Sequence, residues 1–206
     1  MKIFVTGIST NVGKTIVSAM LAESLQADYW KPIQAGDLAN SDSQTVRNLL
    51  SNTKTVIHPE RYRLSTPASP HLAAEIDGVT IEKDNIIEPH THNHLIIEGA
   101  GGLFVPINDL ENVIDLIKPD YKVVIVSRHY LGSINHTLMT IETLWSRNIN
   151  ILGIVFSGDE NVATEKLILE RTGLKMIGRV EEEPFFDKRV IAEYADNFRS
   201  NLTDTL

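Results

Sequence analysis

The sequence predicts an α/β fold in which a mostly parallel sheet carries helices on both faces. Apolar runs alternate with helical patterns along the 206 residues, which is typical of repeated strand–helix–strand units. Three apolar runs, at residues 95–97, 123–126 and 151–156, are almost continuous, as expected of strands that are covered on both faces. Hydrophobic residues make up 42% of the chain, which suffices for a substantial core, and no repeat or linker divides it. We therefore predict one domain over residues 1–206.

The order of the elements follows from where each pattern begins and ends. The predicted strands are Lys2–Thr6, Asp28–Lys31, His94–Glu98, Lys122–Ser127, Ile151–Phe156 and Lys175–Gly178. The predicted helices are Lys14–Leu25, Ser41–Leu50, Ile134–Arg147, Ala163–Arg171 and Lys188–Leu202. Residues 51–93 hold several prolines and ionisable residues, so we expect irregular structure with one or two short helices over the functional edge. Ligands of open α/β sheets bind beyond the carboxyl ends of the strands, and the residues that follow each strand are therefore candidates for function.

The first of these places carries the strongest motif. The strand ending at Thr6 leads into Gly7-Ile8-Ser9-Thr10-Asn11-Val12-Gly13-Lys14-Thr15, and a helical pattern follows. A strand, a glycine-bounded loop, Gly-Lys-Thr and a helix together form a phosphate-binding P-loop. In such a loop the backbone amides hold the phosphates, Lys14 contacts the outer phosphates and the Thr15 hydroxyl can bind Mg²⁺. We therefore predict a single-domain P-loop fold with a nucleoside-triphosphate site.

The loop is a variant of the usual motif. Five residues separate Gly7 from Gly13, where the usual spacing has four. Positions 8 to 12 contain no lysine, whereas the partitioning and positioning ATPases carry an extra lysine near the start of the loop. The alternative function is that of a P-loop switch ATPase that binds a protein or membrane partner. The missing lysine disfavours this alternative.

The composition excludes several classes of function. A net charge of −8 disfavours nonspecific nucleic-acid binding, which requires a basic surface. The absence of cysteine excludes disulfides, thiolate metal sites and the thiol of a glutamine-hydrolysing half-site. No apolar stretch reaches membrane length, and the start of the chain runs directly into the first predicted strand. We therefore expect a cytoplasmic protein with no membrane partner.

Three charged side chains lie at the ends of predicted strands or near the start of a predicted helix. Glu98 ends an apolar strand and can provide an acidic Mg²⁺ ligand opposite Thr15, although a strand-end glutamate can also simply reach solvent. Asp42 is either a metal ligand or a residue that complements the helix dipole. Lys31 is held extended by Pro32 and can face the phosphates from the side opposite the P-loop lysine; the alternative is a snorkelling strand-end lysine.

Two further clusters of ionisable residues allow a functional and an ordinary interpretation. His90, His92 and His94 alternate, so an extended chain would place them on one face, where they could bind a metal. No carboxylate supports them, and a solvated loop is the simpler interpretation. The run Glu181-Glu182-Glu183 follows a predicted strand and either forms a solvated turn or borders the nucleotide.

A set of motifs resembles one enzyme family. The motifs are Gly7 with Gly13-Lys14-Thr15, Lys31-Pro32-Ile33-Gln34, Ser41-Asp42, Pro67-Ala68-Ser69-Pro70-His71, Glu98-Gly99-Ala100-Gly101-Gly102 and Leu131-Gly132-Ser133-Ile134-Asn135-His136. Their order, over residue 1 to about residue 157, resembles the ATP-dependent dethiobiotin synthetases. The resemblance implies a ligase of biotin synthesis that converts 7,8-diaminononanoate, CO₂ and ATP to dethiobiotin, ADP and phosphate with Mg²⁺. It also implies a homodimer with the substrate tail across the subunit interface.

The resemblance also implies the roles of individual residues. The catalytic residues would be Lys14 and Lys31, and the Mg²⁺ ligands would be Thr15, Asp42 and Glu98. The nucleotide would contact Asn11, Val12, Gly13, Lys14, Thr15, Ile16, Asp42, Glu98, Gly99, Ala100, Gly101, Ser157, Glu181, Glu182 and Glu183. The substrate would contact Thr10, Ala35, Gly132, Ser133 and Asn135, with the last three on the second subunit.

Three positions depart from the family pattern. Ala35 stands where Ser or Thr is frequent, and Asn11 where Glu is frequent. Ser157 stands where an asparagine reads adenine, and a hydroxyl cannot provide the paired donor and acceptor of an amide. We therefore expect GTP or CTP to support turnover within about tenfold of ATP. Besides the switch ATPase, a cobyrinate-type amidotransferase fragment without its partner domain is a third interpretation of the motif set.

Overall fold

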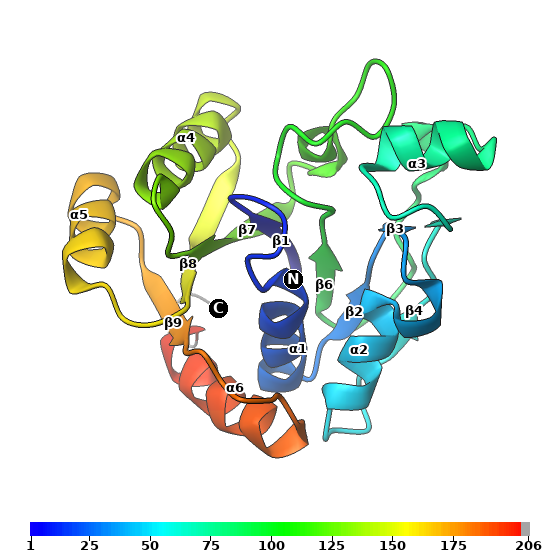
Figure 1. The fold of residues 1–206 in the computed structure, drawn as a ribbon. Helices are drawn as coiled ribbons and strands as arrows, with labels where there is room; N and C mark the ends of the chain where they lie inside the picture. The colour runs from blue at the N-terminus through cyan, green and yellow to red at the C-terminus, as the bar shows by residue number, and fades with distance from the viewer. Residues whose placement is uncertain (203–206) are drawn as a thin grey trace.

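The computed structural model describes residues 1–202, and its main feature is a seven-stranded sheet in the order β4-β2-β6-β1-β7-β8-β9 (Figure 1). Every ladder described in this sheet is parallel. The strands are β1 (Lys2–Gly7), β2 (Asp28–Trp30), β4 (Ile57–His58), β6 (Leu95–Glu98), β7 (Tyr121–Arg128), β8 (Asn150–Ser157) and β9 (Met176–Val180). A second sheet pairs β3 (Ile33–Ala35) with β5 (Tyr62–Leu64), also in parallel. The predicted α/β fold with a mostly parallel sheet is confirmed.

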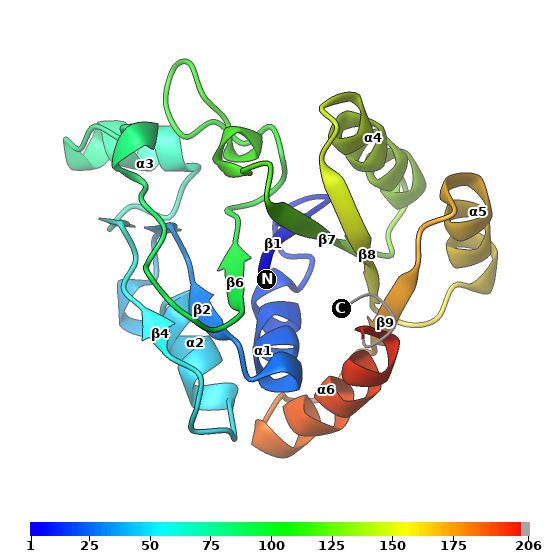
Figure 2. The same cartoon turned by 180° about the vertical axis from the view of Figure 1, so that it is seen from behind.

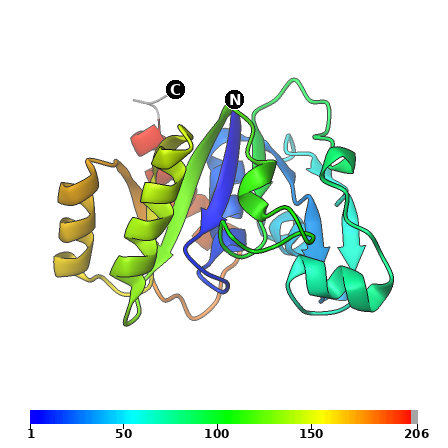
Figure 3. The same cartoon turned by 90° about the horizontal axis from the view of Figure 1, so that it is seen from above.

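Helices cover both faces of the main sheet, as predicted. The α-helices are α1 (Lys14–Leu25), α2 (Asp42–Leu49), α3 (Pro70–Asp77), α4 (Ser133–Ser146), α5 (Val162–Thr172) and α6 (Lys188–Leu202). Short 3-10 helices occupy Leu38–Asn40, Val113–Leu116 and Lys83–Asn85. α1 packs against α2 and α6 on one face, while α4 and α5 pack together on the other (Figures 2 and 3). α3 packs on the small sheet. None of the helices within residues 1–202 is long and apolar enough to cross a membrane.

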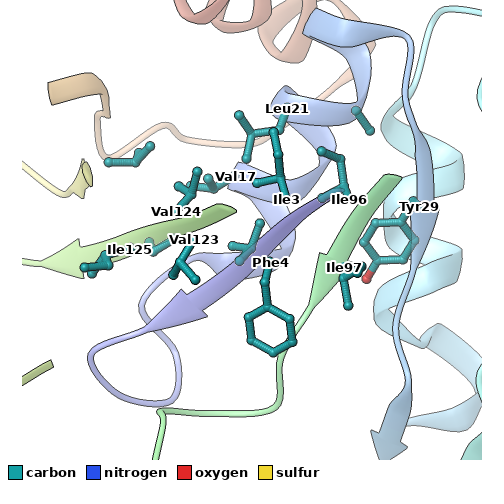
Figure 4. Packing of buried hydrophobic residues seen from close by; sticks show 14 of the residues in the cluster. Ile3, Phe4, Val17, Leu21, Tyr29, Ile96, Ile97, Val123, Val124 and Ile125 are labelled. Carbon is teal, nitrogen blue, oxygen red and sulfur yellow. The ribbon is translucent and has the colours of Figure 1, made fainter. Parts of the chain in front are cut away.

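The core explains why α1 shows no amphipathic pattern. Strand residues alternate between the two faces, so that Ile3 and Ile96 turn toward α1 while Phe4 turns to the opposite side (Figure 4). Because α1 lies over the middle of the sheet and between two other helices, Val17 and residues 19–22 are fully buried. A helix buried nearly all round needs apolar or small residues on every side. This central helix fixes the position of the loop that precedes it.

All the predicted strands and helices exist, but the sequence did not reveal three short strands. β3, β4 and β5 contain two or three residues each, too few to show a periodic pattern. β4 and β5 lie in the segment 51–93 that we expected to be irregular, where α3 is one of the expected short helices. β2 ends at Trp30 and not at the predicted Lys31, because the following Pro32 has no N–H to continue a ladder.

Candidate active site at the carboxyl ends of the strands

The loop between β1 and α1 has the geometry of a phosphate-binding turn. Gly13 precedes the helix with φ 95°, a left-handed conformation that favours glycine. Gly7 is also required, because an added Cβ would lie 2.6 Å from the Ser9 carbonyl oxygen. Gly13 approaches the end of β8, where an added Cβ would lie 3.3 Å from Ser157 Oγ. The displaced first glycine of the motif is therefore a structural part of this loop.

Lys14 lies across the loop and is almost fully buried. Its Nζ donates to the carbonyl oxygen of Ser9 at 3.1 Å, and the residue is 7% exposed. Burial lowers the pKa of Lys14 to about 8, and the carboxylate of Glu98 only partly offsets this effect. A bound phosphate would provide the anion that this buried ammonium lacks. The side chain is therefore placed to contact a phosphate held by the loop.

The lowered pKa of Lys14 predicts that ADP binding weakens above pH 8. Only the protonated form attracts a phosphate, and the pKa of about 8 brings loss of that proton into an accessible range. Lys31 cannot cause the effect, because its pKa is raised above the ordinary lysine value. Calorimetric titration with ADP at fixed Mg²⁺ should show Kd rising above pH 8, with proton uptake on binding. A Kd that stays flat to about pH 9.5 would contradict this assignment.

Glu98, at the end of β6, is the centre of a buried polar cluster. It is 1% exposed and accepts hydrogen bonds from Thr15 Oγ1 at 3.0 Å, Tyr29 Oη at 2.8 Å and Lys31 Nζ at 2.9 Å. Lys31 Nζ also forms an ion pair with Asp42, the first residue of α2. The cluster therefore joins the P-loop, β2, β6 and α2. These contacts rule out the two alternative interpretations, in which Glu98 simply reaches solvent and Lys31 is a snorkelling strand-end lysine.

The charges in this cluster stabilise one another. Burial alone would lower the pKa of Lys31, but the nearby carboxylates of Glu98 and Asp42 outweigh it, and the pKa is raised. Burial would likewise raise the pKa of Asp42, but the Lys31 ammonium outweighs it, and the pKa is lowered. Lys31 therefore remains a cation and Asp42 an anion at neutral pH. A buried carboxylate (Glu98), a partly buried one (Asp42) and a hydroxyl around one lysine form a site suited to cations and phosphates.

A pocket of about 950 Å³ runs along the strand ends and contains this cluster. It crosses the P-loop and has two arms on opposite sides of β1. The arm beside Lys31, called the Lys31 arm below, contains Lys31, Gln34, Ala35, Asp42, Ser69 and Glu98. The distal arm contains Arg128, Ser157, Val180, Glu181, Glu182 and Phe186. Such an elongated pocket can accept a nucleotide with its reacting end beside Lys31.

The pocket brings together most of the residues predicted from the sequence. Those that line it are Thr10, Asn11, Gly13, Lys14, Thr15, Ile16, Lys31, Ala35, Asp42, Glu98, Ala100, Gly101, Ser157, Glu181 and Glu182. Three predicted nucleotide contacts are not among its lining residues. Val12 is 1% exposed and packs beneath the loop, and Gly99 packs so closely on Phe4 that an added Cβ would lie 3.0 Å from its ring. Glu183 accepts a hydrogen bond from Tyr194 Oη at 2.7 Å.

The predicted substrate contacts Gly132, Ser133 and Asn135 lie at the start of α4, outside this pocket. Ser133 is 3% exposed, and Asn135 Nδ2 is 3.4 Å from the sulfur of Met139. Within one chain these residues do not reach the Lys31 arm. A role in substrate binding would require a second subunit.

Several residues of the buried cluster and of the pocket were not predicted. Tyr29 shares a strand face with Lys31, so the period of two could have identified it as a neighbour of the cluster. Gln34 orients α2 by accepting from the Asp42 amide at 3.2 Å, and it stands in the quoted Lys-Pro-Ile-Gln motif. No sequence pattern indicated Arg128 or Phe186, because their positions in the pocket depend on how distant segments fold together.

The three histidines do not form a metal site. The rings of His90 and His92 meet edge to face with centroids 5.0 Å apart, and His94 Nδ1 lies 2.9 Å from the amino terminus. Within residues 1–202 no group of three or more His, Cys, Asp and Glu side chains is arranged to hold a metal ion.

Comparisons with known proteins identify the family of this chain. A family model described as an AAA domain matches residues 1–189. The ATP-dependent dethiobiotin synthetase BioD of Christiangramia forsetii is 56% identical over 98% of this chain and 97% of its own length, and that of Cytophaga hutchinsonii is 52% identical over 94% and 95%. The cell division ATPase MinD of Pyrococcus furiosus has a TM-score of 0.63 over 100% of this chain and 99% of its own, but at 11% identity it shows only the fold. The chain therefore belongs to the ATP-dependent dethiobiotin synthetase family.

Proposed function

We propose that this chain, acting as one domain, uses ATP to join CO₂ to 7,8-diaminononanoate and closes the cyclic urea of dethiobiotin. The single observation that carries the proposal is Lys31, a buried cation bound to Glu98 and Asp42 at the side of the pocket facing the P-loop. The chain also belongs to a family whose relatives are named for this activity, which supports the proposal. Because ATP is the co-substrate, we place the enzyme in the cytoplasm.

The arrangement suits phosphoryl transfer to a carbamate. One substrate amine takes up CO₂ and loses a proton; the carbamate oxygen then attacks the γ-phosphorus, and ADP leaves. The second amine attacks the carbonyl carbon of the mixed anhydride, loses a proton and expels phosphate. Negative charge develops on the transferred group, and Lys14 and Lys31 approach that space from the P-loop and from β2. The loop amides orient the phosphates, so that catalysis is mostly positioning.

The residues present fit a magnesium ion. Thr15, Asp42 and Glu98 provide only oxygen donors, which Mg²⁺ prefers, and all three line the same part of the pocket. When bound together with phosphate oxygens, Mg²⁺ would neutralise charge on the phosphates. We propose these three residues as its ligands.

Replacing Glu98 by glutamine should shift the dependence of activity on Mg²⁺. The amide keeps the size of the side chain but removes the charge. Thr15 and Tyr29 donate to different oxygens of Glu98, so the single amide oxygen can still accept from one of them. We expect half-maximal activation at a Mg²⁺ concentration on the order of tenfold higher. A Mg²⁺ titration of ADP release at fixed ATP measures it. An activation curve that coincides with that of the wild type would mean that Glu98 is structural.

We also propose a homodimer in which a second copy completes the substrate site. Large apolar side chains are exposed on and beside α4, namely Leu131 at 103%, Phe104 at 61% and Met139 at 59%. A second pocket, of about 420 Å³, lies between the loops and α4, and Thr10 lines both pockets. Exposed apolar clusters of this kind mark interaction surfaces. Across such an interface, the start of α4 of the second subunit would offer backbone amides to the substrate carboxylate.

One assay tests the proposed reaction. ADP release is measured with ATP and Mg²⁺ in the presence and absence of diaminononanoate and bicarbonate, and the product is identified by mass. We expect release to require both substrates. ATP hydrolysis that does not depend on either substrate but is stimulated by a protein or membrane partner would refute the ligase activity and favour the switch ATPase.

A further inference from the structure

The distal arm of the pocket ends at a segment with no regular secondary structure. Residues 181–187 follow β9 without forming a helix or strand, and Glu181 and Glu182 line the pocket. If the reacting phosphate lies beside Lys31, as the proposed function requires, the nucleoside extends into this distal arm. The position of the segment therefore affects nucleotide binding. Since no backbone ladder fixes it, side-chain contacts must do so.

Arg128 provides a contact across the pocket wall. It is the last residue of β7, and its Nη2 donates to Glu182 Oε1 at 2.5 Å. β8 lies between β7 and β9 (Figure 1), and the register aligns Arg128 with Ser157 and Ser157 with Val180. The ion pair therefore passes over the carboxyl end of β8.

The end of β8 leaves space for this ion pair. Gly158 follows the strand with φ 97°, and an added Cβ would lie 3.4 Å from Glu182 Oε1. A side chain here would be strained and would touch the Glu182 carboxylate. Ser157, the preceding residue, is small and 6% exposed. Small residues at both positions allow Arg128 and Glu182 to meet.

A second arginine holds the other side of the segment. Arg179 Nη1 lies 3.3 Å from Glu181 Oε1, and its Nη2 donates to Glu160 at 2.8 Å and to Glu165 at 2.6 Å. These contacts attach Glu181 to the start of α5. Arg128 differs because the residue itself lines the pocket, whereas Arg179 is not among the lining residues.

We propose that Arg128 is a positioning residue for nucleotide binding, acting through its ion pair with Glu182. The side chains of Arg128 and Glu182 are 41% and 51% exposed, so the pair is only moderately strong. We expect its loss to weaken ADP binding by about three- to fivefold. The KM for ATP should rise by a similar factor, and kcat should change less, because Lys31 and Glu98 lie on the other side of the P-loop.

The test is a charge exchange read out by ADP binding. Calorimetry would give the Kd for ADP of Arg128→Met, Glu182→Gln and the double variant Arg128→Glu/Glu182→Arg. Each single substitution should weaken binding, and the double variant should recover most of the affinity. Arg147→Met is the matched control: Arg147 is also 41% exposed and pairs with Asp115 at 2.7 Å, but it does not line the pocket. Its Kd should equal that of the wild type.

Two outcomes would overturn the inference. An unchanged Kd in Arg128→Met would show that the ion pair does not affect the nucleotide. A weakened Kd that the charge exchange does not recover would show that Arg128 acts on the nucleotide directly. ADP binding needs no turnover, so a chain that binds ADP normally without making dethiobiotin would refute the proposed function and leave this test intact.

Discussion

Replacing Lys14 by alanine should abolish turnover and leave the fold intact. The loop amides would remain, but the cation that neutralises the outer phosphates would be lost, and this loss is not offset by any amide. Burial lowers the pKa of Lys14 to about 8, which means that the folded protein holds this charge at a cost. In the unfolded chain the pKa returns toward 10.5, so the cost is fully present below pH 8 and disappears above 10.5. The alanine variant should therefore melt no lower than the wild type at pH 7.

The measurement combines ADP release at saturating ATP with a thermal melt. Lys166→Ala is the matched control, since Lys166 is exposed on α5 and forms only a surface pair with Glu170 at 3.7 Å. We expect the control to keep full activity. Turnover near the wild-type rate in Lys14→Ala would remove the P-loop assignment, whereas a large drop in melting temperature would show that Lys14 is needed for the fold.

The sequence was sufficient to predict the parts of the site that one continuous segment forms. The P-loop needs only residues 7–15 and the strand and helix beside them, so its conformation could be inferred locally. Lys31 and Glu98 could be found because each ends or follows a strand of a parallel sheet, where carboxyl ends meet at one edge. That rule predicts that the two residues lie at the same edge of the sheet, but it does not predict which side chains they contact. It could not show that Lys31 binds both Glu98 and Asp42.

Contacts between distant segments depend on the order of the strands, which the sequence alone does not specify. Arg128 reaches Glu182 because β8 lies between β7 and β9 and ends in small residues. The acidic run at 181–183 shows the same limit: Glu181 and Glu182 line the pocket, and Glu183 accepts from Tyr194. Three adjacent identical residues thus have different surroundings. The base preference expected from Ser157 stays a prediction, because the neighbouring arginine and acids also surround that end of the pocket.

Replacing Lys31 by methionine should lower kcat by on the order of 10²-fold or more at saturating ATP and Mg²⁺. The methionine keeps the apolar stem but removes the charge that faces the transferred phosphate and the carbamate. It also leaves Glu98 and Asp42 without their shared cation, and breaking a buried pair by removing one partner is destabilising. A lower melting temperature is therefore expected, and kinetics must be measured well below it.

Lys31→Arg separates the two effects of this substitution. Arginine keeps the positive charge beside Glu98 and Asp42, so the melting temperature should fall less than in the methionine variant. The guanidinium is planar and larger than the ammonium, so its N–H groups cannot reproduce the position of Lys31 Nζ, which lies 2.9 Å from Glu98 Oε1. We therefore expect kcat still to fall. If the position serves catalysis, both variants lose kcat while their Kd for ADP changes little, because ADP lacks the phosphate that Lys31 faces. If kcat were retained and only the KM for ATP rose, Lys31 would bind the nucleotide without taking part in the reaction.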